Sequence, residues 1–123
     1  MKRGRLIQDY LADIFDVSQK AIKVVEGVAY ADFEKNDEKI FAVIRALEII
    51  GDAVKHIPDS LRAEYPQIPW RAIAGMRDKL IHDYFGINIL RIWNTVQKEV
   101  PELLEVIKQM LENKSISEIQ LRL

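Results

Sequence analysis

Apolar residues recur at helical spacing along almost the whole chain, and this pattern limits the possible folds more than any other feature. In the first segment one apolar stripe repeats every three or four residues, while charged and amide side chains fall mostly outside it. Its members are Ile7, Tyr10, Leu11, Ile14, Val17, Ala21, Val25 and Val28. The spacing predicts an amphipathic helix from about residue 4 to the region of Gly27. No segment has the alternation of a strand.

A second helix is predicted to begin at Asn36 or Asp37, either of which is a good N-cap, and to end before Pro58. It carries two apolar stripes on roughly opposite sides. One comprises Ile40, Val43, Ile44, Leu47, Ile50, Gly51 and Val54, and the other, of smaller residues, comprises Ala42, Ala46, Ile49 and Ala53. Because both faces must be covered, we place this helix centrally. The small-residue face would meet another helix of the same chain or the same helix of a second subunit. We predict a homodimer built on this face and on the third helix.

Three of the four prolines follow this helix and predict an irregular connection over residues 57–69, with one short helical turn at residues 60–65. Pro69 suits the start of a third helix, which Gly86 stops. A fourth helix is predicted over residues 89–111, with a bend near Pro101. We therefore expect a single domain over residues 1–123, an all-α up-and-down bundle of four to five helices.

The composition limits the cellular compartments and the classes of protein that this sequence suits. The chain has no cysteine, so it can hold neither a disulfide framework nor a thiolate zinc site, which suits a reducing compartment. Its apolar runs are far shorter than the roughly 20 residues that cross a bilayer, and its basic first residues lead into polar ones. We expect a cytoplasmic protein without membrane contact. Because the net charge is −1, any contact with RNA must be local, weak or transient.

Motifs for most common chemistries are absent from the sequence. It contains no HExxH or EF-hand pattern, no Walker A or GxGxxG loop and no GxSxG elbow, so we expect no metal and no cofactor. Only two histidines occur. His56 lies near the end of the second helix, where its positive form would complement the helix carboxyl end. The other, His82, lies in the third helix.

The third helix places a charge on an apolar face. At about 100° per residue, Arg77 falls near the centre of a stripe formed by Ile73, Leu80, Ile81 and Tyr84. An unpaired buried charge is costly, so the guanidinium needs a partner, and Glu48 and Asp52 of the second helix are candidates. One interpretation is therefore a structural ion pair that pins two helices together.

The functional interpretation joins Arg77 to His82. In an unbroken helix, five residues would point His82 well away from Arg77. The two become neighbours only if the helix ends near His82 or if two subunits bring their copies together. Asp78, directly after Arg77, could orient an imidazole or accept a hydrogen bond.

The run of Arg77, four residues, His82, one residue and Tyr84 resembles the Arg-X4–6-His-X-Tyr signature of the HEPN superfamily. The similarity is greatest to its HepT-like branch of small ribonuclease toxins, and the polar Asp78 after the arginine also matches. The resemblance covers nearly the whole chain. Supporting segments are residues 9–14, 45–51 and 68–78.

This resemblance implies a metal-independent endoribonuclease that acts as a homodimer, with both motifs lining one cleft. Arg77 and His82 would be catalytic, with Asp78 and Tyr84 in support. The resemblance also implies a type VII-like toxin–antitoxin pair, in which an MntA-like nucleotidyltransferase antitoxin attaches adenylate to Tyr84. The alternative is a non-catalytic helical module that dimerises and supports substrate binding by a nucleotidyltransferase.

The proposed roles suit RNA chemistry. RNA carries its own nucleophile, the 2′-hydroxyl, so cleavage needs a proton shuttle and a group that stabilises charge on phosphorus. A histidine such as His82 can act as general acid or base near neutral pH. An arginine such as Arg77 binds phosphate oxygens in a bidentate manner.

Overall fold

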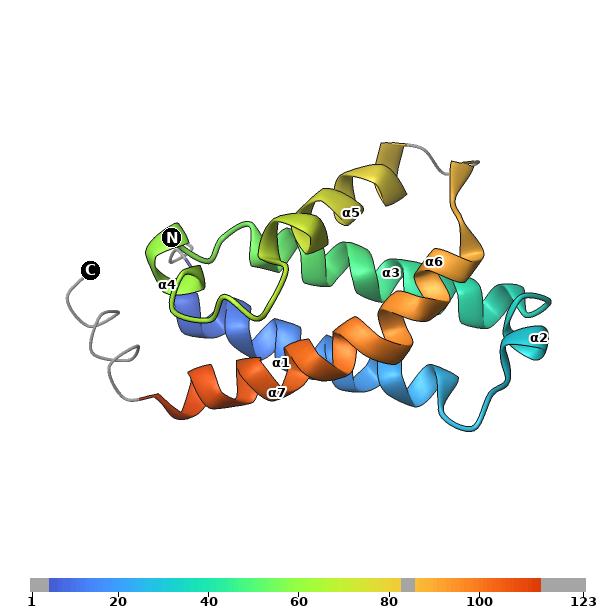
Figure 1. Ribbon diagram of the computed structural model, residues 1–123, viewed down its shortest axis with the longest axis horizontal. Helices are drawn as coiled ribbons and strands as arrows, with labels where there is room; N and C mark the ends of the chain where they lie inside the picture. Colours follow the sequence, from blue (N-terminus) through green and yellow to red (C-terminus); the bar gives the residue numbers. More distant parts are fainter. Residues whose placement is uncertain (1–4, 83–85, 114–123) are drawn as a thin grey trace.

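The computed structural model describes residues 5–82 and 86–113, and over these residues it is an all-α bundle without strands (Figure 1). This confirms the predicted fold class. Four long helical segments dominate the described residues, and two short helices lie in their connections. The elements are α1 (Ile7–Val25), α2 (Tyr30–Phe33), α3 (Asp37–Val54), α4 (Asp59–Arg62), α5 (Trp70–His82), α6 (Ile89–Asn94), a π-helical segment (Thr95–Glu99) and α7 (Val100–Glu112).

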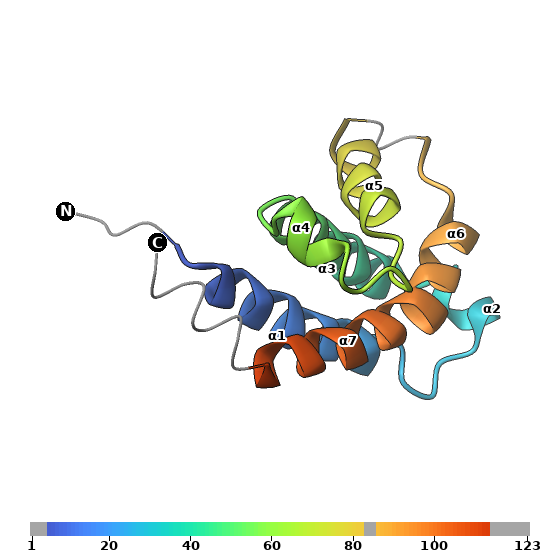
Figure 2. The same cartoon turned by 60° about the vertical axis from the view of Figure 1, so that its left-hand side comes forward.

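The helix α1 agrees with the first apolar stripe. It packs against α3 on one side and α7 on the other, and the two helices enclose most of its apolar face (Figures 1 and 2). Leu11 and Ile14 are fully buried there. The helix ends just before Gly27, whose φ of 73° lies in the left-handed region that glycine adopts without strain.

The central position predicted for α3 is also confirmed. Its N-cap is Asn36, whose side-chain oxygen accepts a hydrogen bond from the backbone N–H of Lys39 at 3.1 Å. One side of α3 packs on α1 and another packs on α5. On the small-residue face, Ala46 and Ala53 are buried by helices of this same chain, whereas Ala42 is exposed. Ala46 and Ala53 are therefore not available to a second subunit, and the predicted use of these two residues in a homodimer interface is wrong.

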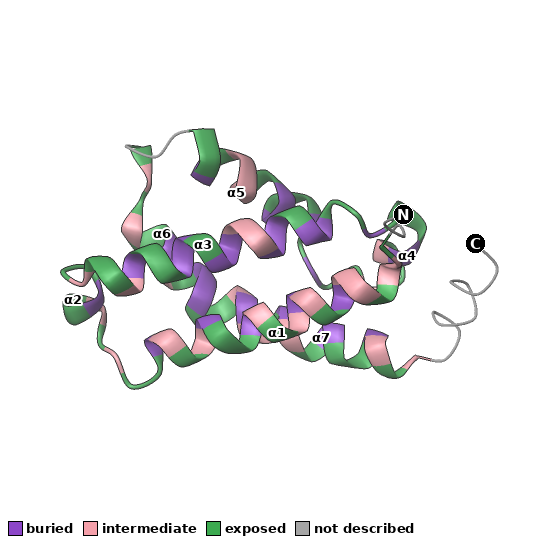
Figure 3. Ribbon diagram, turned by 180° about the vertical axis from the view of Figure 1, so that it is seen from behind, coloured by how far each residue is buried: buried purple, intermediate pink, exposed green. Residues whose placement is uncertain are grey.

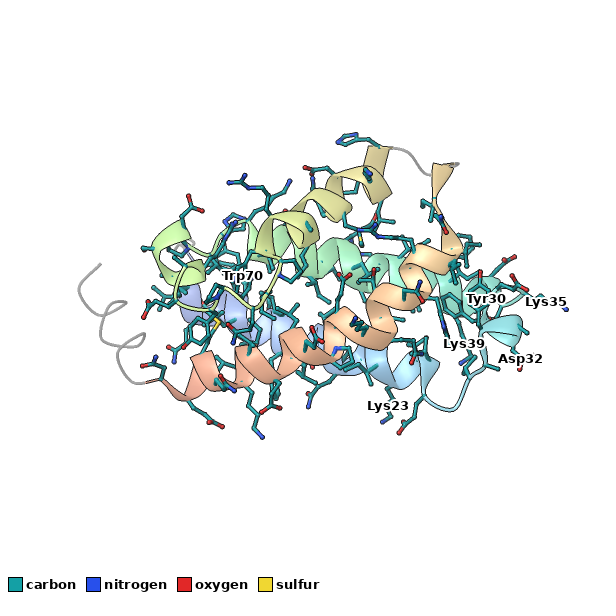
Figure 4. The ribbon with its side chains drawn as sticks, in the orientation of Figure 1. Lys23, Tyr30, Asp32, Lys35, Lys39 and Trp70 are labelled. Atoms are coloured by element: carbon teal, nitrogen blue, oxygen red, sulfur yellow. The ribbon has the colours of Figure 1, made fainter. Side chains whose placement is uncertain are left out.

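The proline-containing connection holds the short helix α4 directly after Pro58, one residue earlier than the predicted turn. Trp70, labelled in Figure 4, is buried at the start of α5 and forms hydrogen bonds with the backbone of this connection. Its indole N–H lies 3.1 Å from the carbonyl oxygen of Arg62 and 3.0 Å from that of Tyr65. The start of α5 is thereby fixed against the end of α4.

The bend predicted near Pro101 is a π-helical segment that joins α6 to α7. A proline cannot donate the backbone hydrogen bond that would continue the α-helical ladder, so a wider turn immediately before it is a physically reasonable junction. The segment is held in the core by Thr95 and Val96, both buried, and the Thr95 hydroxyl donates to the carbonyl oxygen of Arg91 at 2.8 Å.

The helix α5 lies at the edge of the bundle. It packs mainly on α3 and stands away from α1 and α7 in both views (Figures 1 and 2). Its carboxyl end is exposed at Ile81 and His82 (Figure 3). Within the described residues, no helix is both long and apolar enough to cross a membrane.

Candidate functional site

The side chain of Arg77 begins in a tight contact between α5 and α3. A Cβ atom added to Gly51 of α3 would overlap the Cβ of Arg77 and would lie 3.0 Å from the carbonyl oxygen of Ile73. Only a residue without a side chain fits at this point. The glycine therefore lets the aliphatic part of Arg77 lie directly against α3, as the apolar stripe of the sequence predicted.

The guanidinium of Arg77 is partly buried and has carboxylates on two sides. Its Nη1 donates to Oδ1 of Asp78 at 3.1 Å, and its Nη2 lies 3.8 Å from Oδ1 of Asp52. Asp52 was one of the two predicted partners. The other, Glu48, lies 3.5 Å from Nη1 of Arg45 instead. The Nε of Arg77 is buried and has no hydrogen-bond partner among the residues that the structure describes, so one donor remains unused.

Asp78 connects Arg77 to a second cation, Lys55. The Nζ of Lys55 donates to the same Oδ1 at 2.5 Å, and this hydrogen bond is the main cause that lowers the pKa of Asp78, followed by the hydrogen bond from Arg77. The prediction that Asp78 accepts a hydrogen bond is confirmed, although its donors are cations rather than an imidazole. Lys55 was not predicted from the sequence. Its position at the C-cap of α3, three residues after Asp52, was the available signal.

His82 is the last residue of α5 and is exposed to solvent. The helix is continuous from Trp70 through His82, so its end does not turn the imidazole back toward Arg77. Five residues at about 100° each place the two side chains about 140° apart around the helix. Within one chain, Arg77 faces α3 and His82 points away from it. Of the two conditions that the sequence left open, only a second subunit could bring copies of these residues together.

The remaining predicted residues are placed as follows. Ile81, expected on the apolar stripe, is 41% exposed, whereas Ile73 and Leu80 are buried. Tyr84 lies outside the described residues. His56 is exposed beyond the end of α3 and stacks on Tyr10, with ring centroids 4.3 Å apart and planes 3° apart.

No group of three or more potential metal ligands occurs among residues 5–82 and 86–113. The side chains that α5 does assemble are an arginine held by two carboxylates and, on another side of the same helix, a solvent-exposed histidine. An arginine can bind a phosphate and a histidine can exchange a proton, and these are the two components of phosphodiester chemistry, but one copy of α5 carries them on different sides.

The fold and these side chains define a small all-α protein whose outer helix carries an arginine and a histidine. The model of the HepT-like family, described as Ribonuclease HepT-like, matches residues 6–110, and the chain belongs to this family. Ribonuclease activity is therefore the function that its family supports.

Individual relatives agree with this assignment. A candidate RNase of Caldanaerobacter subterraneus is 46% identical over 103 residues, which cover 84% of this chain and 92% of the relative. A candidate RNase of Methanocaldococcus jannaschii is 40% identical over 109 residues, 89% of this chain and 90% of the relative. A candidate ribonuclease HepT of Thermococcus cleftensis is 45% identical over 103 residues, 84% of this chain and 92% of the relative. No solved structure gives a significant match to the chain.

Proposed function

We propose that this chain is a metal-independent endoribonuclease toxin that cleaves RNA at a cleft between two copies of α5. The observation that carries the proposal is the placement of Arg77 and His82 on one edge helix of a HepT-like chain, about 140° apart around its axis. One copy of α5 cannot direct both side chains at one phosphate. Two copies can supply Arg77 and His82 to the same cleft.

The chemistry uses the 2′-hydroxyl of the RNA as nucleophile. His82 of one subunit accepts the proton of that hydroxyl as its oxygen attacks phosphorus. The P–O5′ bond then breaks, and the leaving oxygen takes a proton from His82 of the other subunit. The products are a 2′,3′-cyclic phosphate and a 5′-hydroxyl. Arg77 stabilises the additional negative charge that develops on the phosphoryl oxygens.

Asp78 acts in this proposal as a positioning residue. Its carboxylate holds Nη1 of Arg77 and is itself held by Lys55, so the guanidinium has a fixed orientation before RNA arrives. The buried Nε keeps one edge of the guanidinium against the protein. A phosphate would compete with Asp52, which lies at the longer distance of 3.8 Å, more easily than with Asp78.

Tyr84 is proposed as the regulatory residue. An MntA-like nucleotidyltransferase antitoxin would attach adenylate to its hydroxyl, two residues from His82. The modification adds bulk and negative charge close in sequence to His82, and both changes would oppose binding of an RNA phosphate. The protein and this partner would form a toxin–antitoxin pair.

One observation favours a second function. Both ends of the Arg77 guanidinium already face carboxylates, and this arrangement also fastens α5 to α3 without any substrate. With a net charge of −1, the chain could instead serve as a non-catalytic helical module that dimerises and supports a nucleotidyltransferase. In that case Arg77 is structural and His82 has no catalytic role.

Cleavage of RNA by the purified, unmodified protein tests between the two functions. We expect RNA to be cut in the presence of a chelator, DNA to survive, and the products to carry a 2′,3′-cyclic phosphate. His82→Ala should lower the rate by about 10²–10⁴-fold, the usual contribution of general acid–base catalysis. His56→Ala is the matched control, because the other histidine is also exposed but only stacks on Tyr10, and it should retain activity.

Arg77 needs a control for folding because loss of its side chain would also remove the contacts that fasten α5 to α3. Arg77→Lys keeps the charge and the aliphatic part but loses bidentate binding, so it should fold and cut poorly. A folded His82→Ala protein that cuts RNA at the wild-type rate would refute the mechanism. A wild-type protein that cuts no RNA would favour the helical module.

A further inference from the structure

A pocket of about 550 Å³ lies between α5 and α6, on a different side of α5 from Arg77. Figures 1 and 2 show the two helices that form its walls. Its lining is mixed, and the apolar part includes Met76 and Leu80 of α5 and Ile92 of α6. Leu80 and Ile92 are buried, and Met76 is partly buried. Pockets that bind small ligands have volumes of roughly 300–1,000 Å³, so this one can hold a ligand of nucleotide size.

Two cations line the same pocket, one on each helix. They are Lys79 of α5 and Arg91 of α6, and both are exposed. Neither forms an ion pair or a hydrogen bond through its side chain with any residue in the described part of the chain. This distinguishes them from Lys55 and Arg77, whose charges are directed at carboxylates. An apolar surface beside two unpaired cations suits a ligand that has an apolar body and an anionic group.

Two of the positions that line the pocket, Lys79 and Gly75, lie close to His82 on the surface of α5, whereas Met76 and Leu80 lie further around the helix. Lys79 precedes His82 by three residues, and side chains at this spacing are neighbours on a helix surface. Gly75, which also lines the pocket, precedes His82 by seven residues, so the two positions differ by only about 20° around the helix. A strand whose phosphate lies at the imidazole would therefore pass the mouth of the pocket.

We propose that this pocket binds one nucleotide of the RNA substrate, next to the bond that is cut; this identity of the ligand rests on the proposed ribonuclease function. The base lies against Met76, Leu80 and Ile92, and its phosphate lies between Lys79 and Arg91. Single-stranded RNA is commonly recognised in this way, by an unstacked base on an apolar surface and by cations on the backbone. The pocket thereby selects the nucleotide beside the scissile phosphate.

Gly75 provides a direct way to fill the pocket. A Cβ atom added there meets no atom within 4 Å, so a larger side chain can extend into the pocket while the backbone stays in place. Gly75→Leu should raise the KM for RNA and leave the fold intact, because leucine is also the better helix former. Gln109→Leu is the matched control, since it adds an exposed leucine to α7, away from the pocket, and should bind RNA as the wild type does.

The contribution of Lys79 and Arg91 to RNA binding can be tested by removing the charge of each side chain. Lys79→Ala and Arg91→Ala should each weaken binding of single-stranded RNA by roughly tenfold. Each should also make the negative slope of log affinity against log salt concentration less steep by about 0.7, because one phosphate contact is lost. Lys108→Ala removes an equally exposed lysine from α7 and should change neither quantity.

A spectroscopic measurement tests the pocket without relying on cleavage. The chain has three methionines, of which Met76 lines the pocket and Met110 is fully buried in the core. In protein labelled at the methionine methyl carbons, a 2′-O-methyl RNA tetranucleotide, which lacks the nucleophile and cannot be cut, should shift the Met76 signal. The Met110 signal should stay in place, inorganic phosphate should have little effect, and Gly75→Leu should abolish the shift.

The outcomes separate this proposal from the ribonuclease proposal. A protein that cuts RNA while the tetranucleotide leaves Met76 unshifted would overturn the pocket and keep the activity. A tetranucleotide-dependent shift in a protein that cuts nothing would support the pocket and count against the activity. An equal shift with inorganic phosphate would show a simple anion site and would overturn recognition of a nucleotide.

Discussion

Gly51 and Arg77 meet across α3 and α5 at a point where no side chain can be added to the glycine. The contact has two consequences. It brings the two helices close together, and it sets the direction in which the Arg77 guanidinium leaves the helix, toward Asp52 and Asp78. The geometry of the candidate catalytic arginine therefore depends on a residue that carries no functional group.

Gly51→Ala should destabilise the protein. Its new methyl group would overlap the Cβ of Arg77, and excess volume at a packed contact typically costs about 1–3 kcal/mol, which outweighs the gain of up to about 1 kcal/mol in helix propensity. Urea unfolding measures the difference. Gly75→Ala is the matched control, because there the Cβ has free space, and it should leave stability equal or higher. Equal effects of the two substitutions would contradict the tight contact.

Asp78 should make the stability depend on acidic pH. Its pKa in the folded protein is held below the ordinary value of 3.8 by Lys55 first and by Arg77 second. A lowered folded pKa favours folding at pH values above the unfolded pKa, and this stabilisation is lost as the pH falls through the folded pKa. Asp78→Asn should therefore flatten the loss of stability below about pH 4. Glu105→Gln, an exposed change on α7, should keep the wild-type slope, and an NMR titration should place the Asp78 midpoint below 3.8.

The proposed homodimer should depend on Ile81. This side chain is 41% exposed on α5 and directly precedes His82, so it lies where two copies of the helix would have to approach. A glutamate at this position would place a charge in the apolar contact, and Ile81→Glu should yield monomers in light scattering at micromolar concentration. Leu90→Glu is the matched control on α6, where the leucine is 48% exposed. A wild-type monomer, or a dimer that Ile81→Glu leaves unchanged, would argue against this cleft.

Tyr84 should carry adenylate after co-expression with a nucleotidyltransferase encoded beside this protein. Mass spectrometry should find the added group on the peptide that contains Tyr84. The loss of RNA cleavage should be proportional to the fraction of protein that carries the modification. Tyr84→Phe removes the acceptor hydroxyl and should give unmodified protein. Suppression of cleavage with only unmodified peptide present would indicate that the partner acts by binding alone.

Most of the helical fold could be predicted from the sequence because helices are stabilised by local contacts. Apolar spacing located α1 and α3, and the N-cap expected at Asn36 is present. The four-residue helix α2 was not predicted. It is too short to show a periodic pattern, and its fully buried Phe33 packs on Trp93, with ring centroids 5.0 Å apart, far away in the sequence.

The sequence by itself determined the family resemblance, the candidate residues and the need of Arg77 for a carboxylate. Only the tertiary structure decided that Asp52, and not Glu48, is the partner of Arg77. It revealed the ion pair between Lys55 and Asp78 and the burial of Ala46 within the chain's own bundle. It also showed that α5 continues through His82, which separates the two candidate catalytic side chains within one chain. The physical reason is that contacts between helices depend on how far each helix is rotated and how closely they approach. Those quantities are set by packing between distant residues, such as Gly51 and Arg77, and leave no local pattern in the sequence.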